Sequence, residues 1–88
     1  MNILPYKIVL LHSKDCHQCR YVIEKLKKYG VLDYISLIEQ NDELFNKYKS
    51  KYNINNVPFV IIFLNNNIIS SRLLNKPEDI EWLVDNFC

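Results

Sequence analysis

The chain has 88 residues, of which 49% are hydrophobic, so it can form one small domain with a modest apolar core. Its 11 basic and 10 acidic residues give a net charge of +1, and this balance argues against a nucleic-acid or membrane-surface protein, which needs a basic excess. Three cysteines are an odd number and do not suit a secreted disulfide framework. Residues 1–7 show no secretory signal, and no apolar run approaches the roughly 20 residues of a membrane span. We therefore expect a single cytoplasmic domain over residues 1–88 that acts as a monomer.

The first half of the chain predicts two strands with a helix between them. Residues 7–12 form a short apolar run that is typical of a buried strand. A polar loop follows, in which Ser13 or Asp15 is predicted to cap a helix over residues 16–29. That helix ends at Gly30, the only glycine, which stands where a helix C-terminus favours a left-handed residue. Residues 34–39 alternate well enough to predict the second strand.

The second half predicts a helix, a hairpin and a final helix. Asn41 or Asp42 begins a helix that runs to about residue 52. Residues 59–64 and 68–72 are β-prone runs joined by three asparagines, which tolerate the positive φ of a hairpin turn. Residues 75–78 resemble a capping box before the last helix. The expected inward side chains of the two helices are Leu44, Phe45, Tyr48 and Tyr52, then Ile80, Leu83, Val84 and Phe87.

This order, β-α-β-α-β-β-α, predicts an α/β fold with one mixed four-stranded sheet and helices on both of its faces. The first two strands are expected to be parallel, because a helix connects them through a right-handed crossover. The last two strands are expected to form an antiparallel hairpin.

The segment Cys16-His17-Gln18-Cys19 lies where the first strand meets the first helix. The first turn of a helix has free backbone N–H groups and the positive end of the macrodipole, so a thiolate at Cys16 is stabilised and reactive. Cys19 is three residues further on, which is close enough for the two sulfurs to meet. We therefore predict a redox dithiol in which Cys16 attacks a disulfide and Cys19 resolves the mixed disulfide.

Over nearly its whole length the chain resembles the thioredoxin/glutaredoxin family. The resemblance depends on the Cys16–Cys19 motif after the first strand, on Val57-Pro58 before the third strand, and on the order of the elements. It implies a thioredoxin-like fold and a thiol–disulfide oxidoreductase that reduces protein disulfides. It also implies a cis Pro58 beside Cys16, with the backbone groups of Val57 free to pair with a peptide or glutathione.

The sequence departs from both branches of that family. Asp15 replaces the tryptophan that usually precedes the thioredoxin motif, and Leu10 replaces the buried acid that usually accepts the proton of Cys19. Gln18 replaces a tyrosine that is common in glutaredoxins, and residues 71–75 lack the Gly-Gly pair that helps to hold glutathione. We therefore expect no bound cofactor, protein disulfides as substrates and weak binding of glutathione. The reductant is expected to be an upstream reductase or glutathione.

Lys14 and His17 are the further candidates for the substrate side of the site. A positive charge beside Cys16 favours its thiolate, and His17 supplies one when it is protonated. The alternative for both residues is ordinary exposure to solvent. Cys88 is expected to be a free thiol without a catalytic role.

Two alternative functions stay open. One is a glutathione-dependent glutaredoxin. The other is a non-catalytic module that holds an iron–sulfur cluster or a metal between two chains through Cys16. A zinc site is not predicted, because zinc commonly takes four ligands and His12 and His17 do not have the spacing of such a set.

Overall fold

The structure is a computed structural model that describes residues 5–88, so part of the segment in which we expect no secretory signal, residues 1–4, lies outside the described residues. The elements follow the predicted order, with a short 3₁₀ turn added before the second strand. They are β1 (Lys7–His12), α1 (His17–Lys28), η1 (Leu32–Tyr34), β2 (Ile35–Glu39), α2 (Glu43–Lys51), β3 (Phe59–Leu64), β4 (Asn67–Leu73) and α3 (Pro77–Phe87).

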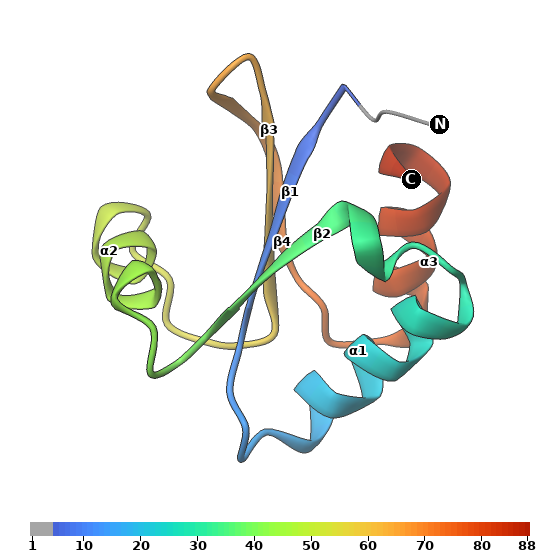
Figure 1. The fold of residues 1–88 in the computed structure, drawn as a ribbon, viewed down its shortest axis with the longest axis horizontal. Helices are drawn as coiled ribbons and strands as arrows, with labels where there is room; N and C mark the ends of the chain where they lie inside the picture. Colours follow the sequence, from blue (N-terminus) through green and yellow to red (C-terminus); the bar gives the residue numbers. More distant parts are fainter. Residues whose placement is uncertain (1–4) are drawn as a thin grey trace.

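The four strands form one mixed sheet in the order β2-β1-β3-β4. The central pair is antiparallel, β1 with β3, while β2 lies parallel to β1 and β4 lies antiparallel to β3. Figure 1 shows α1 and α3 on one face of this sheet and α2 on the other. The predicted mixed sheet with helices on both faces is therefore confirmed.

The core consists of two apolar layers, one on each face of the sheet. Ile8 and Leu10 face α1 and α3, whereas Val9 and Leu11 belong to the layer under α2. Because successive side chains of a strand point to opposite faces, a strand covered on both sides reads as an unbroken apolar run. This is why β1 and β3 stand out so clearly in the sequence.

Both ends of α1 have defined caps. The N-cap is Cys16, not Ser13 or Asp15 as predicted, and its sulfur accepts a hydrogen bond from the N–H of Cys19 at 3.1 Å. At the other end Gly30 has φ +74°, as predicted, with its N–H donating to the Lys27 carbonyl. The N–H of the next residue, Val31, donates to the Leu26 carbonyl, which completes a Schellman motif.

The second half differs from the prediction at two local points. Leu44 was expected to face inward, but it is 46% exposed, while Phe45 is buried in the layer under α2. The hairpin turn has two residues, Asn65 and Asn66, both at positive φ. Asn67, which was expected in the turn, already pairs with β3, because two left-handed residues suffice to reverse the strand.

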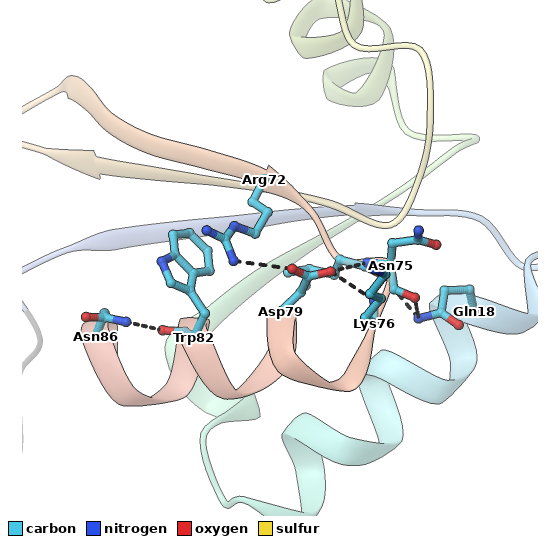
Figure 2. Close-up of polar contacts among 8 residues, drawn as sticks. Gln18, Arg72, Asn75, Lys76, Asp79, Trp82 and Asn86 are labelled. Atoms are coloured by element: carbon cyan, nitrogen blue, oxygen red, sulfur yellow. Dashed lines mark hydrogen bonds and ion pairs between the residues drawn. The ribbon is translucent and has the colours of Figure 1, made fainter.

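The N-cap residue of α3 is Lys76, and the acid of its capping box is Asp79, not the acid at position 78. One carboxylate oxygen of Asp79 accepts the N–H groups of both Asn75 and Lys76 at 2.9 Å (Figure 2). Its other oxygen pairs with Arg72 at 3.2 Å, and the guanidinium of Arg72 lies 4.0 Å from the ring centre of Trp82. Trp82 therefore packs against Arg72 of β4.

Candidate active site

The register of the sheet brings three separate loops together at one edge. Leu11, near the end of β1, pairs with Phe59 at the start of β3, and Phe59 pairs with Leu73 at the end of β4. The segments that follow β1, precede β3 and follow β4 therefore meet at this edge. They carry the dithiol motif, Val57-Pro58 and Leu74-Asn75.

The two cysteines are joined by a disulfide and differ in their exposure. Cys16 is partly exposed, whereas Cys19 lies within α1 and is fully buried. The N–H of Cys19 that donates to the Cys16 sulfur is one of the free N–H groups of the first helical turn. In the reduced protein that N–H and the helix dipole both favour a thiolate at Cys16. The geometry gives Cys16 the accessible sulfur and Cys19 the protected one.

Val57 and Pro58 lie beside the exposed sulfur. The bond between them is cis, as the resemblance implied, and Pro58 is buried. The Val57 carbonyl oxygen lies 4.0 Å from the Cys16 sulfur. The Pro58 carbonyl accepts the N–H of Leu74 at 2.8 Å, which ties this loop to the segment after β4. Within residues 5–88 no backbone carbonyl accepts a hydrogen bond from the N–H of Val57, and the predicted pairing of this group with a peptide stays a prediction.

Gln18 joins the dithiol motif to the third loop, a contact that the sequence did not reveal. Its side-chain amide donates to the carbonyls of both Leu74 and Asn75 at 3.2 Å (Figure 2). These partners are 56 and 57 residues away, and nothing in the local pattern of the motif indicates them.

His17 and Lys14 are both exposed at the start of the helix. The Nδ1 atom of His17 lies 2.8 Å from a guanidinium nitrogen of Arg20. Because a guanidinium only donates, Nδ1 of His17 is the acceptor in this contact. Lys14 has no ion pair among residues 5–88. The predicted roles of both residues toward substrate stay predictions.

The sequence and the structure give different results when each is compared with known proteins. The sequence gives no match to a protein family or to a curated protein. The structure is similar to reduced Schistosoma mansoni thioredoxin pre-protein, with a TM-score of 0.70 and 19% identity over 94% of this chain and 79% of that one. For Plasmodium falciparum thioredoxin the TM-score is 0.68, with 20% identity over 99% and 75%. A thioredoxin f2 in complex with ferredoxin:thioredoxin reductase gives 0.69, with 16% identity over 91% and 74%.

The chain has the thioredoxin fold. Within this fold, the departure at Leu10 has a structural consequence. Leu10 is fully buried in the apolar layer under α1 and α3, and none of the buried side chains among residues 5–88 is polar or charged. Cys19 therefore has no buried carboxylate among the described residues.

A cavity of about 250 Å³ opens beside Cys16 on the α2 side of the thioredoxin fold. It is lined by Ser13, Asp15, Cys16, Gln40, Phe45, Lys49, Ile54, Asn55, Asn56 and Val57. Gln40, Lys49 and the two asparagines were not among the predicted site residues, because they come from α2 and its flanking loops, far from the motif in sequence. Three of its lining side chains, Gln40, Asn55 and Asn56, are amides, which can both donate and accept hydrogen bonds.

Cys88 and His12 do not line this cavity, and both have shifted pKa values. Cys88 is exposed at the end of α3, the helix whose other end adjoins Asn75. Partial desolvation raises the pKa of its thiol. Burial also lowers the pKa of His12, and the charge of Glu39 on the neighbouring strand opposes that effect. Among residues 5–88 no three His, Cys, Asp or Glu side chains gather as metal ligands, and no helix is long and apolar enough to cross a membrane.

Proposed function

We propose that this protein is a thiol–disulfide oxidoreductase that reduces the disulfides of other proteins. The observation that carries the proposal is the asymmetric pair at the edge of the thioredoxin fold. Cys16 caps α1 and is accessible, while Cys19 is buried within reach of it. A nucleophile needs access and a stabilised thiolate, and a resolving thiol needs only to reach the first sulfur.

The reaction proceeds in two exchanges. The Cys16 thiolate attacks one sulfur of a substrate disulfide, which forms a mixed disulfide and releases the other substrate sulfur as a thiolate. The Cys19 thiolate then attacks the Cys16 sulfur, forming the Cys16–Cys19 disulfide and releasing the second substrate sulfur. Two electrons pass from the dithiol to the substrate, and the two released thiolates take up protons from solvent or from the Cys19 thiol.

The substrate is held beside Cys16 by the backbone of Val57. Its N–H and carbonyl groups pair with an extended peptide, while Pro58 closes the base of the site. Lys14 and His17 flank the approach from the α1 side. No bound cofactor is needed, because the chemistry takes place between sulfur atoms.

The reductant that regenerates the dithiol is a reductase, with glutathione as a weak substitute. A structurally similar thioredoxin f2 has been solved with ferredoxin:thioredoxin reductase. The backbone that follows β4 is already engaged, since the N–H of Leu74 donates to Pro58 and the carbonyls of Leu74 and Asn75 accept from Gln18. Few backbone groups of this loop are left for a tripeptide. We place the protein in the cytoplasm as a monomer, where a reducing environment keeps Cys88 a free thiol.

The test is disulfide reduction by single-cysteine variants. Cys16→Ser should abolish reduction of a protein disulfide, and Cys19→Ser should accumulate a mixed disulfide that mass spectrometry detects. Cys88→Ser is the matched control and should retain full activity. Equal trapping by Cys16→Ser and Cys19→Ser would contradict the assigned roles. Regeneration rates with thioredoxin reductase and with glutathione, measured separately, identify the reductant; faster turnover with glutathione would favour a glutaredoxin.

A further inference from the structure

A second cavity, of about 330 Å³, lies at the opposite end of the sheet from Cys16. Its walls come from the start of β1, from α2 and from the β3–β4 hairpin, which Figure 1 shows at the end of the sheet remote from the loop between β1 and α1. It is lined by Lys7, Leu44, Lys47, Tyr48, Lys51, Tyr52, Phe63 and Asn66. The proposed redox chemistry uses none of these residues.

Three aromatic rings form one side of this cavity. Tyr48 and Tyr52 are stacked with their ring centres 5.9 Å apart, and Phe63 lies 6.2 Å from Tyr48 and 6.4 Å from Tyr52. The two tyrosines are only partly buried, so they present aromatic surface to the cavity. Surfaces of this kind bind planar rings by stacking.

Three lysines surround the same aromatic surface. The ammonium of Lys7 lies 5.8 Å from the ring centre of Phe63, and that of Lys51 lies 5.4 Å from the ring centre of Tyr52. Lys47 is one helical turn before Lys51, a spacing at which like charges on a helix repel each other. None of the lining residues is acidic, and the one ion pair among residues 5–88 is between Arg72 and Asp79. Positive charge is therefore concentrated in this cavity, although the whole chain carries only +1.

We propose that this cavity binds a nucleoside phosphate, with the base against Tyr48 and Tyr52 and the phosphates paired with Lys7, Lys47 and Lys51. The volume is at the lower end of the range for small-ligand pockets, which fits one nucleotide. An acidic peptide would use the lysines but would leave the aromatic surface without a partner. The balanced net charge argues against a long surface that binds nucleic acid, but it is compatible with a local site for one phosphate ligand.

The test is calorimetric titration of the full chain with ATP and, separately, with inorganic tripolyphosphate. Lys47→Gln/Lys51→Gln should weaken ATP binding about tenfold or more, because charge-assisted hydrogen bonds are lost. Lys27→Gln/Lys28→Gln on α1 removes the same charge elsewhere and should change the affinity by less than about twofold. Lysines 27, 28, 47 and 51 are exposed, so both variants should fold.

The aromatic contribution is tested by Tyr48→Leu, which keeps an apolar side chain and removes the ring. It should weaken the binding of ATP and leave that of tripolyphosphate unchanged. Equal affinity of the wild type for ATP and tripolyphosphate would overturn the assignment of a nucleoside, and no binding of ATP at about 1 mM would overturn the site. Binding of a hexaglutamate peptide without ATP binding would overturn it in favour of an acidic protein partner. Cys16→Ser should bind ATP as the wild type does, so a failure of the proposed redox function does not affect this result.

Discussion

Gln18 lies inside the dithiol motif, yet its amide is hydrogen-bonded to the loop before α3 (Figure 2). It donates to two carbonyls, and one of the two residues, Leu74, is also bonded to Pro58. Through this chain of contacts a single side chain holds the helix of Cys16 against the loop that closes the site. We assign Gln18 as a positioning residue.

Replacing Gln18 should loosen this contact. Gln18→Ala leaves two carbonyls without their donor and should lower the free energy of unfolding by about 1 kcal/mol. The KM for a protein disulfide should rise more than kcat falls, because the docking loop is affected and the sulfurs are not. Denaturant unfolding and steady-state kinetics measure the two effects.

Matched variants separate a hydrogen-bond role from a packing role. Gln18→Glu keeps the shape but removes the donor, so it should behave like Gln18→Ala. Gln18→Lys keeps a donor of similar reach and should recover most of the lost stability. If Gln18→Glu were as stable as the wild type, the two hydrogen bonds would not explain the role of Gln18.

At the scale of elements, the ends of the helices fix the loops that form the site. Asp79 sits in the first turn of α3 and accepts two backbone N–H groups from the segment that follows β4. Burial raises the pKa of its carboxyl, but hydrogen bonds from the N–H groups of Lys76 and Asn75 and the charge of Arg72 outweigh burial and bring it below its ordinary 3.8. A carboxyl with a depressed pKa in the folded state stabilises the fold when it is ionised.

Asp79→Ala should lower the free energy of unfolding by about 1–2 kcal/mol near neutral pH, because the cap is lost. The stabilisation from Asp79 is fully present above the ordinary pKa and disappears as pH falls through the lower pKa of the folded state. The difference between wild type and Asp79→Ala should therefore shrink below about pH 4. Urea unfolding at a series of pH values measures it.

The neighbouring acid is the natural control for this prediction. Glu78 is exposed and was the acid that the sequence pattern favoured as part of the cap. Glu78→Ala should cost less than half of the Asp79→Ala effect, since only its interaction with the helix dipole is lost. If Glu78→Ala and Asp79→Ala lowered the free energy of unfolding equally, the hydrogen bonds of Asp79 would add no stability beyond the interaction of an acid with the helix dipole.

At the scale of the whole molecule, the three cysteines fall into two separate environments. Cys16 and Cys19 are at one end of the sheet, where the loops between the strands and helices meet. Cys88 follows the last turn of α3. The first turn of the same helix lies beside the end of the sheet that carries Cys16 and Cys19. A helix of 11 residues therefore separates Cys88 from the site, and partial desolvation raises the pKa of its exposed thiol.

In the reduced protein, alkylation near neutral pH should modify Cys16 first. Cys19 is buried, and the raised pKa of Cys88 leaves little of its reactive thiolate. The rate at Cys88 should increase as pH rises toward its pKa, and at neutral pH it should stay below the rate at Cys16. Peptide mapping after timed iodoacetamide treatment measures each rate, with Cys88→Ser as the control. Alkylation of Cys88 as fast as that of Cys16 at neutral pH would contradict both assignments.

The sequence was sufficient for features that depend on near neighbours along the chain. The apolar runs of β1 and β3, the left-handed Gly30 and the asparagine turn follow from the steric and burial demands of short segments. The pairing of Cys16 with Cys19 could also be predicted from local sequence, because a spacing of three residues on a helix brings two sulfurs close enough to meet. The assignment of Val57-Pro58 to the same site needed the resemblance to thioredoxins in addition, because these residues are far from the motif along the chain.

Local patterns failed where several side chains were chemically equivalent candidates. Ser13, Asp15 and Cys16 can all accept a hydrogen bond from a helix N–H, and the path of the loop from β1 decided for Cys16. Leu44 and Phe45 are both apolar, but α2 places only Phe45 over the sheet. Such choices depend on where the helix lies against its neighbours, which periodicity alone does not specify.

Only the tertiary structure decided which distant segments meet. Gln18 reaches carbonyls 56 and 57 residues away, and Lys7 joins Lys47 and Lys51 around one cavity because β1 lies between β2 and β3. These contacts are set by strand order and register, which result from the packing of the whole core on both faces of the sheet. A sequence pattern fixes the chemistry that each residue offers, and the register of the sheet determines the residues with which it is combined.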